Sequence, residues 1–147
     1  MSDETRFLSN FYPYKKNGGK YPYTVKVIYN DIEFDCVENA YQAAKFLNKA
    51  NQEIFAKMNP YQTKKFWENR SDFRSDWSEI KLIIMENLVR QKFNNSAELK
   101  QMLLDTKDAI LEEGNDWNDT FWGVCNGIGE NHLGKILMKI RQELKAP

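Results

Sequence analysis

The sequence is poor in the residues that hold structural metals. Among 147 residues it contains two cysteines, Cys36 and Cys125, and one histidine, His132. Structural zinc sites use four cysteine or histidine ligands at short, paired spacings, and these three residues do not provide such a set. The sequence therefore argues against a structural zinc site and fits a reducing compartment such as the cytoplasm, where disulfides are rare.

Long apolar runs and an excess of charge of one sign are also absent. No segment approaches the ~20 apolar residues that span a membrane, and the N-terminus lacks the apolar stretch of a signal peptide. The 21 lysine and arginine residues balance the 21 aspartate and glutamate residues. A global basic field for nucleic acid is therefore excluded, which leaves only a local basic patch. We expect a soluble cytoplasmic protein without a membrane contact.

Length and pattern predict one small domain, residues 1–147, with no repeat, linker or low-complexity tract. Residues 23–34 indicate a β-hairpin, because strand-forming residues flank a turn at Asn30-Asp31. Helical patterns follow at Val37–Phe46, at Asn51–Trp67 with a break at Asn59-Pro60, at Trp77–Phe93, after Ser96, and at Leu133–Leu144. The expected fold class is α+β: a small, mainly helical single domain with an N-terminal β-hairpin.

Two finer predictions concern apolar residues. The long helix should face the core with one stripe, which consists of Trp77, Ile80, Ile84 and Leu88, with Ile83 beside it. Further along the chain, Ile110 and Leu111 suit a short strand before a glycine-rich segment.

The helix expected at Val37–Phe46 has two incompatible faces. At about 100° per residue, one face carries small or apolar residues: Ala40, Ala43, Ala44 and Leu47. The opposite face carries an acid, an amide, a cation and two rings: Glu38, Tyr41, Gln42, Lys45 and Phe46. Rings for stacking beside a few hydrogen-bonding groups are what a polar ligand site needs. The alternative is that Glu38 is only an acid near a helix start and that Tyr41 and Phe46 are ordinary core residues.

A glycine-rich segment lies late in the chain, and five of the seven glycines fall within 114–134. Glycines that lead into a helix N-terminus can present backbone N–H groups and a positive dipole end to an anion such as phosphate. Gly127, Gly129 and Asn131 stand in that place before the last helix. Their spacing matches neither the P-loop nor the dinucleotide-binding motif, so a plain surface loop is the alternative.

Asp119 is the acid of this segment with the most distinctive neighbours. Trp117 and Trp122 flank it in the sequence. Large rings can desolvate a carboxyl group and raise its pKa, which suits acid–base chemistry. We therefore regard Asp119, together with the polar face of the 37–46 helix, as the part of the chain that carries chemistry.

Four segments, in this order, resemble the NADAR family, whose name refers to NAD and ADP-ribose association. They are 7–13 (FLSNFYP), 37–46 (VENAYQAAKF), 74–93 beginning with RSDW, and 119–141, which contains DTFWG and GENHLG. Together they extend over nearly the whole chain, which makes the resemblance far more specific than any single motif. Two features depart from the family: Asn39 stands where histidine is frequent, and the loop at 124–128 is shorter than in some members.

The resemblance implies an N-glycosidase that hydrolyses the C1′–N bond of a phosphorylated ribose without a metal or cofactor. One branch of the family acts on phosphoribosylamino-pyrimidine intermediates of riboflavin synthesis, and another removes ADP-ribose from guanine bases in DNA. We place this chain with the second branch, because zero net charge and a wide aromatic surface do not oppose ADP-ribosylated DNA as a partner. There are three alternatives. The chain could act on the substrates of the first branch, it could be a non-catalytic module that binds ADP-ribose or a nucleotide, or it could be a purely structural protein.

The resemblance also assigns roles to residues in the matched segments. Glu38 is expected to act as the base or as the stabiliser of an oxocarbenium-like state, with Asp119 as its partner, and the two roles are interchangeable. The substrate-binding residues expected are Ser9, Asn10, Phe11, Tyr41, Gln42, Lys45, Trp77, Trp122, Gly123, Gly129 and Asn131.

Each binding role has a plain structural alternative. Trp77 and Trp122 either stack on the base or fill the core, and the residues 9–11 either form a binding edge or only a turn. Lys45, with N–H groups near Gly129 and Asn131, either holds phosphate oxygens or forms an ion pair or lies in solvent. The basic residues that could follow a DNA backbone, or form a solvated face, are Lys15, Lys16, Lys64, Lys65, Arg70 and Arg74.

Overall fold

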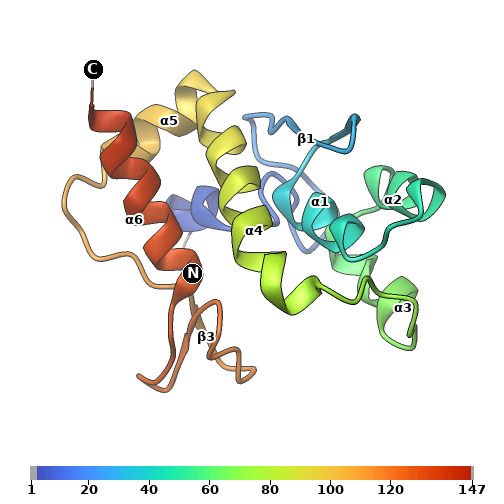
Figure 1. Cartoon of the computed structure of the whole chain (residues 1–147). Coiled ribbons are helices and arrows are strands. Elements are labelled where there is room, and N and C mark those ends of the chain that lie inside the picture. The colour runs from blue at the N-terminus through green and yellow to red at the C-terminus, as the bar shows by residue number, and fades with distance from the viewer. Residues whose placement is uncertain (1–2, 147) are drawn as a thin grey trace.

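Helices make up most of the regular secondary structure, and a β-hairpin lies near the start of the chain (Figure 1). The computed structural model describes residues 3–146. Its helical elements are the 3-10 helices η1 (Asp3–Leu8) and η2 (Pro60–Gln62) and the α-helices α1 (Val37–Ala44), α2 (Lys49–Ala56), α3 (Lys64–Trp67), α4 (Trp77–Asn94), α5 (Ala97–Leu104) and α6 (His132–Lys145). Its strands are β1 (Val27–Tyr29), β2 (Ile32–Phe34), β3 (Gly114–Asn115) and β4 (Val124–Cys125). The predicted α+β class is confirmed.

The hairpin forms as its sequence predicts, with a shorter first strand. β1 and β2 pair in antiparallel register, with Val27 opposite Phe34, and both of these side chains are buried. The turn residues Asn30 and Asp31 have φ of 51° and 62°. This left-handed conformation is what both central residues of a type I′ turn require, and asparagine and aspartate tolerate it.

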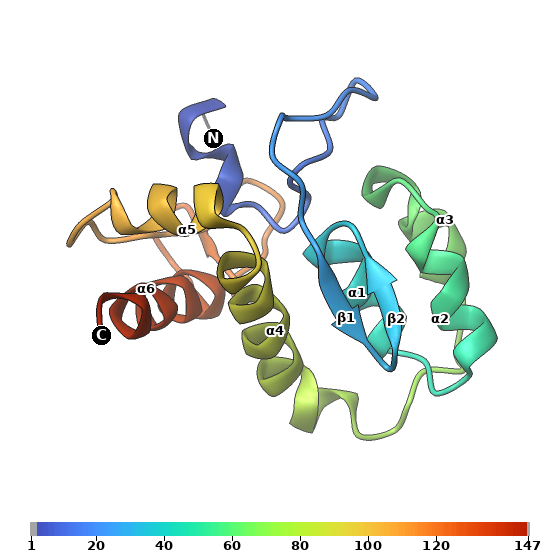
Figure 2. The same cartoon turned by 90° about the horizontal axis from the view of Figure 1, so that it is seen from above.

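α4 is the central element of the fold. Figure 2 shows it between α5 and α6 on one side and α1 with the hairpin on the other. The largest fully buried side chains include Phe34, Phe46, Phe55, Leu88 and Phe93. Each such side chain stabilises the fold by roughly 1.5–3 kcal/mol through its removal from water. Among the helices of residues 3–146, none has the apolar length that a bilayer requires.

The core stripe predicted for α4 is confirmed at Leu88, is only partly buried at Trp77, Ile80 and Ile84, and is wrong at Ile83. Ile83 is 70% exposed, and only Leu88 of the predicted stripe is fully buried. The buried residues of α4 are Met85, Leu88, Val89, Lys92 and Phe93. They all lie from Met85 onward, whereas Trp77 and Ile84, nearer the N-terminus, pack against the core while only partly buried. A helical pattern predicts the direction of a buried face, and it does not predict where along the helix the neighbours end.

α1 ends earlier than predicted. Its last helical residue is Ala44, so the periodicity that placed Leu47 with the alanines no longer applies there. Leu47 is 71% exposed, and Phe46 turns into the core instead of the polar face. The Phe46 ring packs against Phe55 (centroid distance 5.7 Å) and Phe73 (5.2 Å). The core alternative therefore holds for Phe46.

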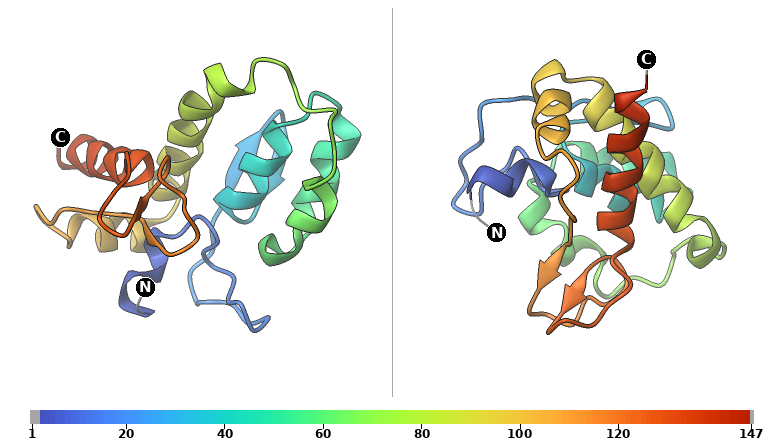
Figure 3. Two further views of the ribbon diagram at one scale, coloured as in Figure 1. Left: turned by 90° about the horizontal axis from the view of Figure 1, so that it is seen from below. Right: turned by 90° about the vertical axis from the view of Figure 1, so that its left-hand side faces the viewer.

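The segment between α5 and α6 has a different strand from the one predicted. Ile110 is 81% exposed, whereas Leu111 is buried, and neither residue belongs to a strand. The strand is β3, which pairs in parallel with β4. Figure 3 shows this segment extending beyond the helices at one end of the molecule. A two-residue strand has no alternation that a sequence pattern can detect.

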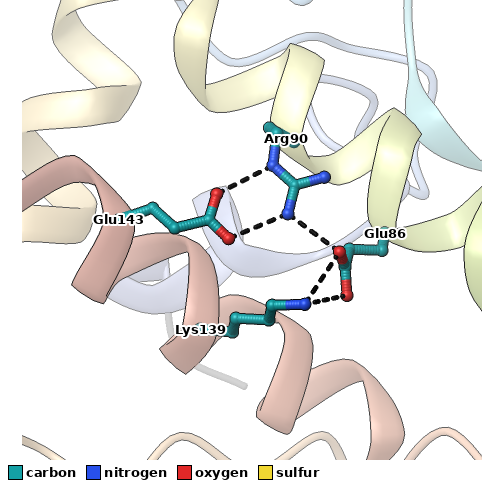
Figure 4. A network of polar contacts seen from close by, with 4 residues as sticks. All are labelled: Glu86, Arg90, Lys139 and Glu143. Atoms are coloured by element: carbon teal, nitrogen blue, oxygen red, sulfur yellow. Dashed lines mark hydrogen bonds and ion pairs between the residues drawn. The ribbon is translucent and has the colours of Figure 1, made fainter.

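An ion-pair network fixes α6 on α4 (Figure 4). Arg90 donates from Nε and Nη2 to the Glu143 carboxylate at 2.9 Å each. Its Nη2 also donates to Glu86 at 2.8 Å, and Lys139 Nζ donates to both Glu86 oxygens at 3.1 Å. Bidentate pairs within a network stabilise more than isolated surface pairs do, so α6 has a defined position on α4.

Candidate active site

One cavity gathers most of the residues that the sequence predicts to be functional. Its volume is about 630 Å³, and it lies between α1, the 9–11 turn and the 113–122 loop. The predicted residues that line it are Ser9, Asn10, Phe11, Glu38, Tyr41, Gln42, Lys45, Asp119 and Trp122. Segments that are far apart in the sequence thus meet around a space of the size that small-molecule ligands occupy.

α1 supplies one polar wall of this cavity. Its small face is fully buried: Ala40, Ala43 and Ala44. On the opposite face, Gln42 Nε2 donates to Glu38 Oε2 at 2.7 Å. The backbone N–H of Glu38 donates to the Asn10 carbonyl at 3.0 Å, which ties the 9–11 turn to the start of α1. The predicted two-faced helix is confirmed over 37–44, and Glu38 is held from both sides.

Glu38 is surrounded closely enough for its ionisation to change. Burial, the largest effect, raises the pKa of its carboxyl group. The hydrogen bond from Gln42 and the charge of Lys45 oppose this shift in pKa, and the charge of Asp119 adds to it. Such a group exchanges a proton at a pH closer to neutrality than an exposed glutamate does.

Glu113 is a third carboxylate of the cavity, and sequence reasoning missed it. Burial raises its pKa to about 7, with the charges of Asp119 and Glu38 adding to the shift and a hydrogen bond from Asn115 opposing it. Its buried Oε2 has no hydrogen-bond partner among the described residues. A buried polar oxygen without a partner is costly, and a reacting group that accepts or shares its proton would satisfy it.

Asp119 is held by its own loop. Its Oδ1 accepts hydrogen bonds from the backbone N–H groups of Phe121 at 3.2 Å and Trp122 at 2.9 Å. The Asn115 side chain bonds both the N–H and the C=O of Asp119, at 3.0 and 2.8 Å. Trp117 is 64% exposed at the same loop. These bonds fix the position of Asp119 within its loop.

Lys45 lies over a ring instead of in solvent. Its Nζ is 4.3 Å from the centroid of Trp67 and 5.7 Å from that of Tyr41. Burial lowers its pKa, and the charge of Glu38 partly offsets this change. The described residues provide no ion-pair partner for Lys45, so its charge faces the cavity and is open to an anionic ligand.

The tryptophans divide into a cavity wall and a support. Trp122 lines the cavity, whereas Trp77 packs behind Tyr41, with ring centroids 5.0 Å apart. Tyr41 also meets Trp122 edge to face at 5.6 Å. Trp77 therefore takes the packing alternative and fixes Tyr41, while the Trp122 ring borders the space for a ligand.

At Asn131 the anion site expected before the last helix is not formed. The backbone N–H groups of residues 130–133 donate to carbonyls of residues 120–123, at 2.7 to 3.3 Å. These donors are therefore occupied within the protein and do not face a phosphate. Gly123, Gly129 and Asn131 lie outside the cavity lining.

These three residues instead place the loop that carries the acids. A side chain at Gly129 would collide with the Gly123 backbone, and one at Gly123 would collide with Glu113. Asn131 Oδ1 accepts from the Glu113 N–H at 3.0 Å, and its Nδ2 donates to the Leu111 carbonyl at 2.9 Å. The late glycines serve close packing of the loop on the start of α6, which positions Glu113.

Other cavity residues are not among the predicted catalytic and substrate-binding residues. Besides Glu113, they are Pro60, Tyr61, Thr63, Lys64, Trp67, Met85, Trp117 and Leu133. Several belong to the η2–α3 region, whose weak helical pattern gives no sign of a site. In the sequence Lys64 is only one member of a lysine pair, and its place at the cavity depends on how α3 packs.

Lys92 is a second residue whose position the sequence does not reveal. It is 1% exposed, and its Nζ donates to the carbonyls of Phe7 at 2.6 Å and Ser9 at 2.8 Å. Burial lowers its pKa to about 7. A lysine on an amphipathic helix is ordinarily exposed, and here it instead fixes the turn that borders the cavity.

Asn39, which departs from the family pattern, points away from the cavity. It is fully buried, and its Nδ2 donates to the Met58 carbonyl at 2.6 Å.

Asn39→Ala removes this bond and leaves the Met58 carbonyl unpaired, so the free energy of unfolding should fall by about 1–3 kcal/mol. Urea unfolding checks this, with the exposed Asn69→Ala as control; loss of activity per folded molecule would contradict the structural role.

Comparisons with known proteins agree with this arrangement. The model of the NADAR domain matches residues 1–145. The N-glycosidase YbiA of Shigella boydii is 35% identical over 148 residues, which cover 97% of this chain and 84% of the relative. A riboflavin biosynthesis protein of Vibrio vulnificus is 33% identical over 95% of this chain, which corresponds to 35% of that protein.

The fold has a solved counterpart. The NMR structure of the Escherichia coli protein YbiA superposes with a TM-score of 0.80 at 31% sequence identity. The match covers 98% of this chain and 80% of that chain. The elements that form the cavity therefore belong to a shared architecture.

Proposed function

The chain belongs to the NADAR family, and from this membership we propose that it is an N-glycosidase for the C1′–N bond of a phosphorylated ribose. The observation that carries the proposal is the meeting of Glu38, Glu113 and Asp119 around one cavity with aromatic walls. Relatives of similar length are named N-glycosidases, which supports a glycosyl hydrolase.

The reaction requires carboxyl groups in two roles. When the C1′–N bond breaks, positive charge develops at C1′, and a nearby carboxylate lowers the energy of that state. Water adds its oxygen to C1′ and loses a proton to a base, while the departing nitrogen takes up a proton from an acid. The products are the free base and the phosphorylated sugar.

The three acids suit these roles. Glu113 has a pKa of about 7, so near neutrality it can hold the proton that the departing nitrogen needs. Glu38 is held beside Gln42 and Lys45, where its carboxylate stabilises charge at C1′ or activates water. Asp119, with one oxygen fixed by backbone donors, is the partner of Glu38, and these two roles can be exchanged.

The remaining cavity residues bind the substrate. Tyr41 and Gln42 share the face of Glu38 and orient ribose hydroxyl groups. Lys45 and Lys64 supply positive charge for a phosphate group at the same cavity. The Trp122 ring provides a surface on which the base stacks.

The substrate we propose is a guanine base in DNA that carries ADP-ribose. Trp117 supports this choice, because a 64% exposed ring at the cavity can stack on a base that is still part of a strand. The second candidate is a phosphoribosylamino-pyrimidine, which the name of the Vibrio vulnificus relative favours.

The test presents both substrates to the protein and follows product release by mass spectrometry. We expect release of ADP-ribose from ADP-ribosylated guanine DNA, with the unmodified oligonucleotide as control. Release only from the phosphoribosylamino-pyrimidine would replace the first candidate with the second. Binding of ADP-ribose without release from either substrate would contradict the N-glycosidase and favour a binding module.

A further inference from the structure

A second, basic pocket adjoins the active-site cavity. Its volume is about 320 Å³, and its lining consists of Arg6, Tyr14, Lys15, Lys16, Asn17, Tyr21 and Tyr61. Tyr61 also lines the active-site cavity, and its ring packs on Phe11 with centroids 4.7 Å apart. The two spaces therefore meet at a pair of rings.

The cations of this pocket have no acidic ion-pair partner among the side chains of residues 4–146. The described ion pairs include none that involves Arg6, Lys15 or Lys16. The nearby acid Asp35 is bound instead by the Tyr14 hydroxyl at 2.6 Å and by Lys20 at 3.8 Å. In a chain with zero net charge, three unpaired cations around one hollow form a local positive site.

Other basic residues of the chain do not add to this site. Arg70 pairs with Asp72, and Arg74 donates to Asp76 at 2.7 Å. Their charges are therefore balanced within the 69–76 loop. The cations of the basic pocket, in contrast, are not balanced by any ion pair of the described side chains.

The wall of the basic pocket is an ordered turn. Lys15 N–H donates to the Gly19 carbonyl at 2.8 Å, and Tyr21 N–H donates to the Pro13 carbonyl at 2.7 Å. The Lys15 Nζ lies 4.7 Å from the centre of the Tyr21 ring, which itself stacks on Tyr12 at 5.3 Å. These contacts hold the backbone that carries Lys15 and Lys16, and Arg6 of η1 lines the same pocket.

We propose that the basic pocket binds a second phosphate group of the substrate, one that lies beyond the ribose in the active-site cavity. A substrate with a single phosphate is served by Lys45 and Lys64 in that cavity, which leaves Arg6, Lys15 and Lys16 without a ligand. A diphosphate or a phosphodiester chain crosses the Phe11–Tyr61 rings and places its next phosphate among these cations. The inference rests on the proposed function, because it takes the ribose position from it.

The test uses calorimetric binding to the full chain, so that it does not depend on turnover. The variant Arg6→Gln/Lys15→Gln/Lys16→Gln is compared with a control that removes three exposed charges elsewhere: Lys49→Gln/Lys57→Gln/Lys100→Gln. The probes are ribose 5-phosphate, ADP-ribose and a single-stranded oligonucleotide. Ribose 5-phosphate reports the cavity alone, and the other two carry a further phosphate.

We expect the pocket variant to lose at least about tenfold in affinity for ADP-ribose or the oligonucleotide, and less than about twofold for ribose 5-phosphate. A loss of affinity for ADP-ribose would show that the pocket binds a diphosphate. A loss of affinity for the oligonucleotide alone would show that it binds a phosphodiester. The proposal would be overturned if the pocket variant and the control variant bound ADP-ribose with equal affinity and also bound the oligonucleotide with equal affinity. Absence of turnover by the wild type, with this loss of affinity intact, would overturn only the N-glycosidase.

Discussion

Glu113→Gln is expected to lower kcat by about 10²–10⁴-fold, because a positioned proton donor contributes on this scale to cleavage. Glutamine keeps the size and the hydrogen-bonding shape of the side chain but cannot give up a proton to the departing nitrogen. KM should change little, since the substrate contacts of Lys45, Tyr41 and Trp122 remain.

The same variant should be more stable than the wild type above neutral pH. In the folded protein the pKa of Glu113 is raised from its usual 4.5 to about 7, so the folded state holds the proton more tightly than the unfolded chain. Stability from this group is intact below pH 4.5, falls as the pH rises toward 7, and stays low above it. At pH 8, glutamine should therefore raise the free energy of unfolding by about 1–3 kcal/mol, an amount discounted because Glu113 is partly exposed.

Two measurements check Glu113: steady-state kinetics, and urea unfolding at pH 4, 6 and 8. The control is Glu112→Gln, which removes the neighbouring exposed acid and should leave both quantities nearly unchanged. Unaltered kcat in Glu113→Gln would remove Glu113 from the reaction. A stability gain that is equal at all three pH values would show that its ionisation is not the cause.

Glu38→Gln is expected to lower kcat/KM by about 10³-fold or more, because the charge that stabilises C1′ is lost. The glutamine side chain can still form a hydrogen bond with Gln42 and has nearly the size of glutamate, so the fold should persist. The charge of Glu38 also supports the protonated form of Lys45, and its loss should weaken phosphate binding as a secondary effect.

The measurement for Glu38 is kcat/KM together with circular dichroism and thermal unfolding. Glu53→Gln, at an exposed position of α2, is the matched control and should behave like the wild type. A folded Glu38→Gln variant that retains more than about a tenth of the activity would contradict a direct role in catalysis.

Local periodicity explains what could be predicted. The two faces of α1 follow from helical spacing over eight residues, and this spacing by itself groups Glu38, Tyr41, Gln42 and Lys45. The turn at Asn30-Asp31 and the cap at Ser96, whose Oγ accepts from the Leu99 N–H at 3.2 Å, are also local. Such features need only neighbours within a few residues.

What could not be predicted depends on contacts between distant segments. Glu113 reads as one of two adjacent acids in a surface loop, and only the packing of that loop on Asn131 brings it to the cavity. Lys92 reads as an exposed helix residue until the carbonyls of Phe7 and Ser9 surround it. From the sequence, the backbone N–H groups just before α6 are expected to be free to bind a phosphate. In the structure, those of residues 130–133 donate to carbonyls of residues 120–123, and this pairing depends on how the loop folds back on itself.

The most direct test of the central claim is a crystal structure of Glu113→Gln with an uncleaved substrate bound. The account predicts the ribose in the 630 Å³ cavity, with C1′ about 3–4 Å from a carboxylate oxygen of Glu38 and the scissile nitrogen facing position 113. A substrate bound elsewhere, or a C1′ atom out of reach of all three acids, would contradict it.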